Sequence, residues 1–525
     1  MENHSVSMTE AQDGFEFEFS DVFNVAVSFI DRHLTEGRAD KIAIRTTSGE
    51  EVTYGELAAN VNRCGNFFKS SGLTKGNRLI MVVKDCPEFF YIFWGSIKAG
   101  IIPIPINTLL RAKDYRFIID NSECSAVLYS PEYKSEIEPA LKMAQNSPAL
   151  SISIQGEEKD LVQLIQKSPA DLEAAETHAD DECFFLYSSG STGNPKGAVH
   201  CHKDMMYTSL NYGVKTLGIN ENDVTFSAAK LFFAYGLGNG MHFPLWAGAT
   251  TILFDGRPTP DTIFDAIEKF KPTIYFGVPT LYGAQLLNME EKTWDLSSIR
   301  TCVSAGEALP PDLFRRWQEK TDLIILDGIG STEILHIFIS NRSDDYCLGS
   351  SGRLVPGYQA KILGDDNNPV KQGDAGKLWI KGGSTAKCYW NNPEKTAATM
   401  QNEWLNTGDT YYQDDNGYYH YCGRNDDMLK VGGIWCSPFE IEAKLIEHPK
   451  VLEAAVVGAP DDQNLIKPKA YLVLKNPEDQ SEELEKELLQ LCKKGLAPYK
   501  YPRWFIFQET LPMTATGKIQ RFKLR

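Results

Sequence analysis

One segment constrains what this chain can fold into and bind more than any other: the residues from Tyr187 to His200 read YSSGSTGNPKGAVH. Strand-forming residues lead into it from Cys183. Its glycines allow the backbone to approach an anion and to aim N–H groups at it, and its hydroxyl side chains add further donors. These features predict a phosphate-binding loop. Its candidate residues are Ser188, Ser189, Gly190, Ser191, Thr192, Gly193 and Lys196.

Two other interpretations of this segment are weaker. It is not a Walker A loop, because Pro195 stands where that pattern requires the glycine before its lysine. A generic loop rich in glycine and serine is usually only a flexible turn. Here many specified positions follow a strand, so phosphate binding is the better interpretation.

The acidic balance of the chain argues against one large class of function. The sequence holds 53 basic and 70 acidic residues, for a net charge of −17 among 525 residues. An extended nucleic-acid surface needs clustered lysine and arginine, so we expect no nucleic-acid partner. A local site can still bind anionic small molecules against the field of the whole protein.

The cysteines and the apolar segments indicate a cytoplasmic protein. None of the 11 cysteines falls in a CxxC pair, which is typical of thiols in a reducing cytosol. The polar, acidic N-terminus lacks the form of a signal or transit peptide. The most apolar stretch, from Tyr91 to Ile106, is interrupted by Lys98, Gly100 and two prolines. It therefore cannot span a bilayer, and we expect no membrane partner.

Short β-branched runs alternate with amphipathic segments, which predicts α/β architecture with parallel strands. The apolar segment Phe89–Ile97 suits a helix that crosses between two such strands. The predicted strands in this part of the chain are Arg78–Val83, Ala126–Tyr129, Thr273–Phe276, Leu323–Leu326 and Cys183–Tyr187.

The pattern changes near Tyr421, where a small second domain is expected. We place the boundary so that residues 1–424 bind ATP and the carboxylate, and residues 425–525 form a mobile C-terminal domain. The elements predicted there are strands Glu453–Val457, Ala470–Lys475 and Trp504–Gln508, and a helix opened by Ser481 that carries Leu484, Leu488 and Leu491 at helical spacing.

The phosphate-loop segment resembles the signature loop of the adenylate-forming superfamily, which includes acyl-CoA synthetases, peptide-synthetase adenylation domains and luciferases. Further segments match the motifs of that superfamily in order: Ser304–Ala308, Asp327–Glu333 and Thr407–Asp409. The resemblance implies an α/β fold with a large N-terminal domain of parallel-rich sheets and a small α+β C-terminal domain joined by a hinge. It also implies ATP, Mg²⁺ and coenzyme A as the small molecules bound.

The same resemblance assigns roles around the nucleotide. Thr332 would bind the α-phosphate and Glu333 would hold Mg²⁺, although a Thr–Glu pair by itself is more often a helix cap. Asp409 would bind both ribose hydroxyls, a good match for a carboxylate, with Arg424 beside the ribose. Asp327 follows a predicted parallel strand, where nucleotides commonly bind. The remaining nucleotide contacts implied are Ala305, Gly306, Glu307, Asp327 and Gly328.

The C-terminal motifs imply a two-step reaction. Asp426 would be the hinge, and Gly432 and Gly433 would line the tunnel for the pantetheine arm of coenzyme A. A lysine near a C-terminus is usually a surface charge, but the TATGK context of Lys518 resembles the terminal motif that carries the adenylation lysine. Lys518, Thr332 and Glu333 are thus the expected catalytic residues, and rotation of the small domain would exchange the lysine for the thiol tunnel.

Two segments resemble the benzoate–CoA ligases more closely than the superfamily at large: Lys230–Asn239 and Glu333–Phe338. Aromatic and aliphatic walls with glycines suit a flat, apolar ring. His336 in the second segment would, taken alone, more often be an ordinary packed side chain. The acyl pocket implied by the resemblance consists of Ala234, Tyr235, Gly236, Gly330, His336 and Ile337.

Several alternatives stay open at this point. An apolar pocket separates substrates that differ by a methylene by only about 1–3 kcal/mol. Cyclohexane- or cyclohexene-carboxylate is therefore an alternative substrate to benzoate, and the ATP-forming direction an alternative physiological direction. A different class of function would be an inactive binding or scaffold homologue. A peptide-synthetase domain is disfavoured by the missing carrier domain, and no luciferase oxygenation pocket is identifiable. A homodimer stays open.

Overall fold

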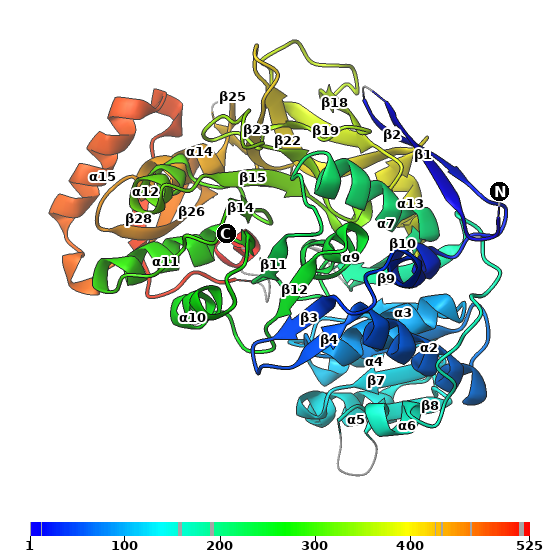
Figure 1. Ribbon diagram of the computed structural model, residues 1–525. Coiled ribbons are helices and arrows are strands. Elements are labelled where there is room, and N and C mark those ends of the chain that lie inside the picture. The colour runs from blue at the N-terminus through cyan, green and yellow to red at the C-terminus, as the bar shows by residue number, and fades with distance from the viewer. Residues whose placement is uncertain are drawn as a thin grey trace.

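The computed structural model describes residues 2–11, 13–155, 160–188, 194–425, 427–431, 434–462, 465–513 and 519–525 (Figure 1). Its largest sheet has nine strands in the order β17-β16-β15-β14-β13-β11-β12-β3-β4. The six strands from β15 to β3 pair in parallel. They are β3 (Ile42–Thr46), β11 (Val224–Ser227), β12 (Thr250–Leu253), β13 (Ile274–Gly277), β14 (Thr301–Ser304) and β15 (Ile325–Gly330).

The edges of this sheet are antiparallel. Three amphipathic helices connect or follow its central strands and bury one face each. The edge strands are β4 (Glu51–Thr53), β16 (Ile337–Ser340) and β17 (Arg353–Leu354), and the helices are α10 (Pro260–Phe270), α11 (Pro279–Glu291) and α12 (Pro311–Thr321).

A second sheet of four strands, in the order β6-β5-β7-β8, is parallel throughout. The crossover helix α3 (Pro87–Lys98) follows β5, and every one of its residues is buried. Proline at its first position suits a helix start, because that N–H has no intrahelical acceptor. The strands are β5 (Arg78–Val82), β6 (Ile102–Pro105), β7 (Ala126–Tyr129) and β8 (Leu150–Ser153).

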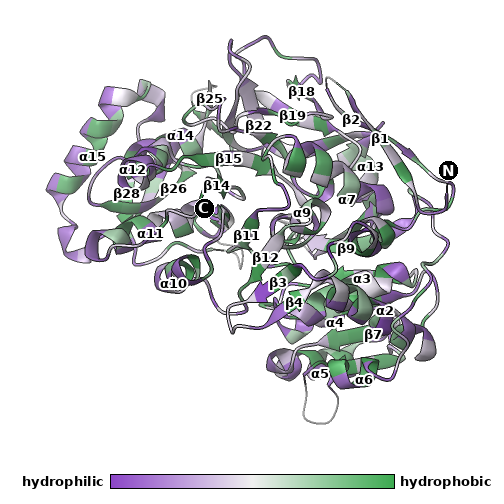
Figure 2. Ribbon diagram, viewed as in Figure 1, coloured by the Kyte–Doolittle hydropathy of each residue, from purple (hydrophilic) through white to green (hydrophobic). Residues whose placement is uncertain are grey.

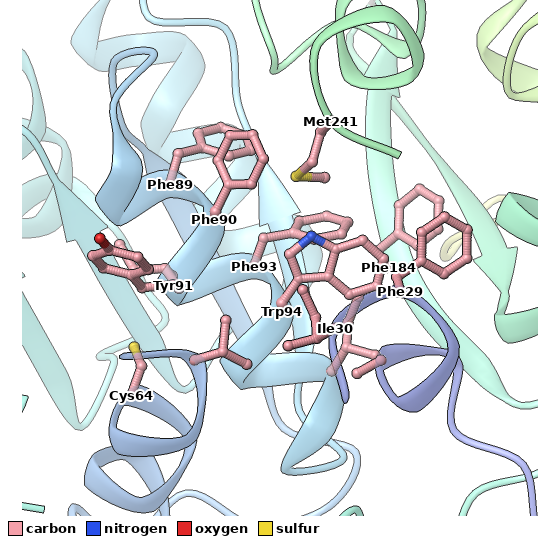
Figure 3. Close-up of a cluster of buried hydrophobic side chains, with 14 of the residues drawn as sticks. Phe29, Ile30, Cys64, Phe89, Phe90, Tyr91, Phe93, Trp94, Phe184 and Met241 are labelled. Carbon is pink, nitrogen blue, oxygen red and sulfur yellow. The ribbon is translucent and has the colours of Figure 1, made fainter. Parts of the chain in front are cut away.

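Helix α3 is apolar on all sides because it lies between layers (Figure 3). Trp94 stacks on Phe29 with ring centroids 5.1 Å apart, and Phe93 contacts Phe184 at 5.6 Å. This core therefore joins the N-terminal segment, the second sheet and the strand that leads into the predicted phosphate loop.

The other sheets of the large domain are antiparallel. The three-stranded sheet β20-β10-β9 contains β9 (Glu182–Ser188), β10 (Lys196–Cys201) and β20 (Cys388–Tyr389). A five-stranded sheet contains β18 (Gln359–Leu363), β19 (Gly376–Lys381), β21 (Met400–Gln401), β22 (Trp404–Gln413) and β23 (Tyr419–Arg424). A hairpin forms from β1 (Val6–Ala11) and β2 (Gly14–Phe19).

The remaining helices of this part are mostly short. The longest, α2, begins with a capping box in which Thr53 and Glu56 bond each other's backbone N–H groups. These helices are α1 (Arg32–Thr35), α2 (Tyr54–Ser70), α4 (Ala112–Ser122), α5 (Lys134–Met143), α6 (Leu161–Ile165), α7 (His202–Thr208), α8 (Ala234–Leu237), α9 (Phe243–Ala247) and α13 (Pro393–Thr399).

The C-terminal residues form their own sheet and core, with α15 at the left edge of Figure 1. Strands β26 and β27 are antiparallel, and β28 returns in parallel to β27 after α15. Ser481 caps α15 as predicted, but its buried face carries Cys492 in place of Leu491 beside Leu484 and Leu488. The elements are β24 (Leu429–Val431), β25 (Ile434–Cys436), α14 (Pro438–Ile446), β26 (Val451–Pro460), β27 (Ile466–Leu474), α15 (Glu482–Gly495) and β28 (Trp504–Phe507).

The predicted fold class, α/β with parallel-rich sheets and a smaller α+β unit, is confirmed. Figure 2 shows apolar residues along the inner strands and polar residues on α15 and other outer helices. Within the described ranges, every helix is too short or too polar to cross a membrane.

Most of the predicted strands differ from the observed ones in their bounds, and one of these differences affects a site motif. The segment Leu323–Leu326 was expected to end before the Asp327 motif, but β15 begins at Ile325 and continues through Gly330. Glycine is unfavourable within strands, so the pattern predicts an end there. Here β16 approaches closely: a Cβ added at Gly330 would lie 2.7 Å from the carbonyl oxygen of His336. Close approach of the two backbones explains the glycine.

Candidate active site

Two of the predicted motifs lie side by side at the carboxyl ends of parallel strands. Ser304, the last residue of β14, pairs with Gly277 of β13 on one side and with Asp327 of β15 on the other. The Tyr235 hydroxyl lies across the same strand ends, 3.2 Å from the carbonyl oxygen of Gly277 and 3.3 Å from that of Val303. Ligands of open α/β sheets bind at this edge.

The Ser304–Ala308 motif, which the resemblance implies to hold the adenine, and the start of the Asp327 motif have a constrained backbone. Gly306 has a φ of 93°, a conformation that favours glycine. Asn341 donates to the carbonyl oxygen of Asp327 from its backbone N–H at 2.9 Å and its side-chain amide at 3.1 Å. Burial raises the pKa of the Asp327 carboxyl well above its usual range. The nucleotide contacts predicted for Ala305, Gly306, Glu307, Asp327 and Gly328 stay predictions.

The Thr332–Glu333 motif forms a short 3-10 turn over Thr332–Ile334. Ser331 caps this turn, because its hydroxyl accepts a hydrogen bond from the Ile334 N–H at 3.2 Å. The cap is therefore supplied by the preceding serine. Leu335 follows with a φ of 72°, which a residue with a side chain rarely adopts.

Strand β20 holds the Glu333 end of this turn. The Tyr389 hydroxyl donates a hydrogen bond of 2.7 Å to Oε1 of Glu333. The backbone N–H of Ala386 donates to the Glu333 carbonyl oxygen, also at 2.7 Å. Both the carboxylate and its backbone are thus fixed.

Lys196, from the predicted phosphate loop, reaches the same place. Its ammonium lies 5.0 Å from the centre of the Tyr389 ring. Burial lowers the pKa of Lys196, the Glu333 carboxylate opposes this shift, and the nearby charges of Lys395 and Arg424 add to it. Lys196, Lys395 and Arg424 are thus near enough for their charges to act on one another, and cationic side chains gathered in this way attract a polyphosphate.

Asp409 and Arg424, predicted to contact the ribose, face each other across two strands. They are paired in the antiparallel register of β22 and β23. Arg424 Nη1 lies 3.1 Å from Asp409 Oδ1 and donates to the Thr407 carbonyl oxygen at 3.2 Å. Gly408, which directly precedes Asp409, has a φ of 76°, and a Cβ there would lie 2.7 Å from the Arg424 guanidinium. The structure brings this pair together, and its ribose role stays a prediction.

Two of the predicted acyl-pocket residues, Tyr235 and His336, are in contact. His336 is 2% exposed, and its Nε2 lies 3.2 Å from the Tyr235 carbonyl oxygen and 3.0 Å from Oδ1 of Asn239. Both partners accept, so Nε2 carries the proton. Burial lowers the pKa of His336 to about 3, so the ring is neutral. Phe243 packs edge-on against it with centroids 4.5 Å apart.

The glycines predicted for the acyl pocket have a packing reason of their own. A Cβ at Gly236 would collide with the carbonyl oxygen of Lys230, and Gly330 lies against the backbone of β16. Ala234 and Ile337 are buried. Close backbone approach thus explains the two glycines without reference to a ligand, and the pocket assignment of these residues stays a prediction.

Several predicted site residues lie outside the described part of the chain. They belong to the phosphate loop, the hinge, the thiol tunnel and the terminal motif: Ser189, Gly190, Ser191, Thr192, Gly193, Asp426, Gly432, Gly433 and Lys518.

Sequence reasoning missed residues that hold the site together. Tyr389 lies in a two-residue strand that the hydropathy pattern does not reveal. Asn239 ends the Lys230–Asn239 segment, but the sequence did not predict its contact with His336. His200 closes the phosphate-loop segment, and strand alternation from Lys196 places it on the same face, which is a usable signal.

Comparison with known proteins agrees with this geometry. The family model described as AMP-binding enzyme matches residues 31–390, and the model of the AMP-binding enzyme C-terminal domain matches residues 440–518. A benzoate–CoA ligase of Thauera aromatica is 49% identical over 505 residues, covering 96% of each chain.

Solved structures are similar along nearly the whole chain. An anthranilate CoA ligase in complex with anthranoyl-AMP has a TM-score of 0.92 and 43% identity, covering 97% of each chain. A benzoate CoA ligase from Burkholderia xenovorans LB400 has a TM-score of 0.88 and 43% identity, covering 96% of this chain and all of that one. The protein described here belongs to the family of AMP-binding enzymes.

Proposed function

We propose that this chain is an ATP-dependent, AMP-forming ligase that joins an aromatic, benzoate-like carboxylate to coenzyme A. The carboxylate would attack the α-phosphorus of ATP and expel pyrophosphate, and the thiol of coenzyme A would then displace AMP from the acyl-adenylate. The observation that carries this proposal is the 49% identity, over 96% of both chains, to a benzoate–CoA ligase. The meeting of two nucleotide motifs at the carboxyl ends of β14 and β15 supports it.

Phosphoryl transfer needs positioning and charge stabilisation more than covalent help. We assign the leaving pyrophosphate to the loop from Ser188 to Gly193 and to Lys196, whose ammonium lies 5.0 Å from the centre of the Tyr389 ring. Thr332 would contact the α-phosphate. The carboxylate of Asp409, held 3.1 Å from Arg424, would accept the ribose hydroxyls.

The residues present fit a magnesium ion carried in with ATP. Mg²⁺ in nucleotide sites commonly takes one or two carboxylates and otherwise phosphate oxygens and water. Glu333 supplies a carboxylate whose Oε1 is already oriented by Tyr389 at 2.7 Å, next to Lys196. When bound, the ion would neutralise charge on the phosphate oxygens.

The acyl pocket would lie around Tyr235 and His336, as the resemblance implies, with Ala234, Gly236, Gly330 and Ile337 beside them. The neutral ring of His336 and its aromatic neighbours form an apolar, rigid surface. Such a surface suits a flat ring. Alicyclic acids of similar size remain the alternative substrates to test.

The C-terminal assignments rest on sequence motifs. We propose Lys518 as the lysine that bridges carboxylate and α-phosphate, Asp426 as the hinge, and Gly432 and Gly433 as the tunnel for coenzyme A. The domains would be residues 1–424 and 425–525, and the separate core of the C-terminal elements supports that division.

We also propose a cytoplasmic location. Nine of the eleven cysteines are buried and none is paired in a disulfide, which suits a reducing compartment. A homodimer is the assembly to test by size-exclusion chromatography with light scattering.

The deciding experiment is ATP–pyrophosphate exchange by the purified full chain, followed by a kcat/KM panel. Benzoate, 2-aminobenzoate, 4-hydroxybenzoate, cyclohexane-carboxylate and cyclohexene-carboxylate should be compared. We expect exchange that depends on the carboxylate and is fastest with an aromatic acid. Exchange that no carboxylate stimulates would indicate a non-catalytic homologue, and a higher kcat/KM for an alicyclic acid would replace benzoate as the substrate class.

A further inference from the structure

The fully buried His200, a residue of strand β10, lies against the Thr332–Glu333 turn. Its Nδ1 lies 2.8 Å from Oδ2 of Asp204, and its Nε2 lies 2.8 Å from the carbonyl oxygen of Thr332. Both His200 and Asp204 are 0% exposed. The same carboxylate oxygen accepts the Cys201 N–H at 3.0 Å. Burying a polar pair of this kind costs free energy. The imidazole of the pair contacts the motif that is predicted to bind the nucleotide.

The hydrogen bond to Thr332 fixes which atom of the ring carries a proton. A carbonyl oxygen only accepts, so Nε2 must donate. Nδ1 then either donates to an ionised Asp204 or accepts from a neutral one. Both arrangements keep Nε2–H directed at Thr332. The carboxylate therefore orients the ring and the ring orients the turn, as carboxylates do for functional histidines elsewhere.

The plane of the His200 ring is fixed as well. Phe184 is paired with it across β9 and β10, and the rings stack with centroids 5.2 Å apart and planes 19° apart. Phe184 in turn packs on Phe93 of the buried helix α3 at 5.6 Å. The imidazole is thus anchored to the main core, and it cannot rotate away from Thr332 without disturbing that core.

His200 shares one sheet face with the other groups that reach the turn. Residues two and four apart on a strand point to the same side, so Lys196 and His200 face together. Tyr389 lies opposite Ala198 in the antiparallel pairing of β10 and β20 and is therefore on this side too. The His200 imidazole and the Tyr389 phenol from this face hold the two ends of the same short turn, and the Lys196 ammonium lies 5.0 Å from the centre of the Tyr389 ring.

The turn needs anchoring because its backbone is strained. A φ of 72° at a residue with a side chain, as at Leu335, is unfavourable and persists only where the surroundings hold it. Without the His200 contact, the Thr332 end could relax. The Thr332 hydroxyl and the Glu333 carboxylate would then lose their common orientation.

We infer that His200 and Asp204 form a positioning pair that holds the Thr332 carbonyl and so presents Thr332 and Glu333 to the nucleotide. Its consequence for catalysis rests on the proposed function. The pair positions the Thr332–Glu333 motif and is not catalytic, because His200 contacts the backbone of this motif.

Three variants test the pair. His200→Phe keeps the stacking on Phe184 and removes both hydrogen bonds. Asp204→Asn tests the carboxylate: the one oxygen that faces both the Cys201 N–H and Nδ1 becomes an amide oxygen or an amide nitrogen, so the two contacts can no longer both hold while the proton stays on Nε2. His33→Phe is the matched control, because His33 is also 0% exposed and packs against a tyrosine ring, with centroids 4.1 Å apart, but lies in α1.

In kinetics, His200→Phe should lower benzoate-dependent ATP–pyrophosphate exchange by about 10–100-fold per folded molecule. Thioester formation from pre-made benzoyl-adenylate should fall less. Asp204→Asn should lower exchange in the same direction, by less than His200→Phe does, and His33→Phe should show no loss per folded molecule. Equal losses in His200→Phe and His33→Phe, or in both half-reactions, would reduce the pair to ordinary core packing.

Amide hydrogen exchange tests the same inference without any turnover. The N–H groups of Ile334 and Leu335 donate within the turn, and in His200→Phe they should exchange about tenfold faster or more. Asp204→Asn should speed their exchange by less than His200→Phe does, and His33→Phe should leave them protected. If the unmodified chain shows no carboxylate-dependent ATP–pyrophosphate exchange, the proposed function fails. The inference about His200 and Asp204 is then decided by amide hydrogen exchange alone. Unchanged amide protection in His200→Phe would overturn the inference.

Discussion

Replacing Tyr389 with phenylalanine isolates one hydrogen bond at the centre of the site. The hydroxyl donates to Oε1 of Glu333 at 2.7 Å, while the ring faces the Lys196 ammonium at 5.0 Å. Phenylalanine keeps the ring and its contact with the lysine. The change therefore removes only the orientation of the carboxylate by the phenol.

The expected magnitude follows from the environment of that bond. A hydrogen bond to a charged group contributes about 1.5–3 kcal/mol. Glu333 is partly exposed, so water can replace part of the lost contact, and the lower value applies. A loss of about 1.5 kcal/mol lowers kcat/KM for ATP about tenfold.

The assay is the initial rate of benzoate-dependent ATP–pyrophosphate exchange over a range of Mg·ATP concentrations. Tyr418→Phe is the control, because the Tyr418 hydroxyl also donates to a carboxylate, Asp345, in a hairpin away from the phosphate-loop strand. We expect that control to exchange normally. A Tyr389→Phe rate within about twofold of the unmodified chain would refute the idea that the phenol orients Glu333.

Lys518→Ala should raise the activation free energy of adenylation by about 3 kcal/mol, which lowers the rate of ATP–pyrophosphate exchange roughly a hundredfold. It should largely spare thioester formation from pre-made adenylate. Equal losses in the two half-reactions would contradict a role for this lysine in adenylation. Burial lowers the pKa of His33, His202 and His336 to about 3, so each is neutral when folded and takes up a proton on unfolding below its ordinary pKa of about 6.5. Protonation of these histidines in the unfolded chain therefore lowers the free energy of unfolding as the pH falls from about 6.5 toward about 3, and it has little effect above about pH 6.5. Each histidine should lower the free energy of unfolding by about 1.4 kcal/mol between about pH 7.5 and 5.5. Urea unfolding at both pH values checks this, and His202→Asn should remove one histidine's share; an unaltered pH dependence would contradict the lowered pKa. Gly330→Ala should lower the free energy of unfolding by about 1–3 kcal/mol, because its Cβ would meet the His336 carbonyl oxygen; an unchanged urea midpoint would show that β16 gives way.

Local patterns predicted the elements that depend on local physics. The apolar run Phe89–Ile97 lies within α3, which extends from Pro87 to Lys98. Ser481 begins α15 through the hydroxyl contact expected of a cap. In both cases the deciding interactions span only a few residues. Such elements can be read from sequence alone.

Pairing between distant segments could not be read in this way. The phosphate-loop strand β10 is antiparallel to β9, and its other neighbour is the two-residue strand β20, almost two hundred residues along the chain. The register of that pairing is what brings Tyr389 to Glu333. The site motifs were predicted as separate segments with separate roles, whereas the contacts that join them depend on register.

The His200 contact to Thr332 shows the same limit. Strand alternation places His200 on the face of Lys196, but nothing in the sequence says which turn that face covers. Burial of Asp204 depends on tertiary packing, and so does the lowered pKa of His336. The chemistry of the motifs was predictable from sequence, and their mutual support was not.

Oxygen-18 in benzoate follows the bond that defines an AMP-forming ligase. If a carboxylate oxygen attacks the α-phosphorus and coenzyme A then displaces AMP, that oxygen leaves with the AMP. Full turnover with [¹⁸O₂]benzoate, ATP and coenzyme A should place one ¹⁸O in the phosphate of AMP and none in pyrophosphate, as read by mass spectrometry. Unlabelled AMP, or label in inorganic phosphate from an acyl-phosphate route, would contradict an acyl-adenylate reaction in this protein.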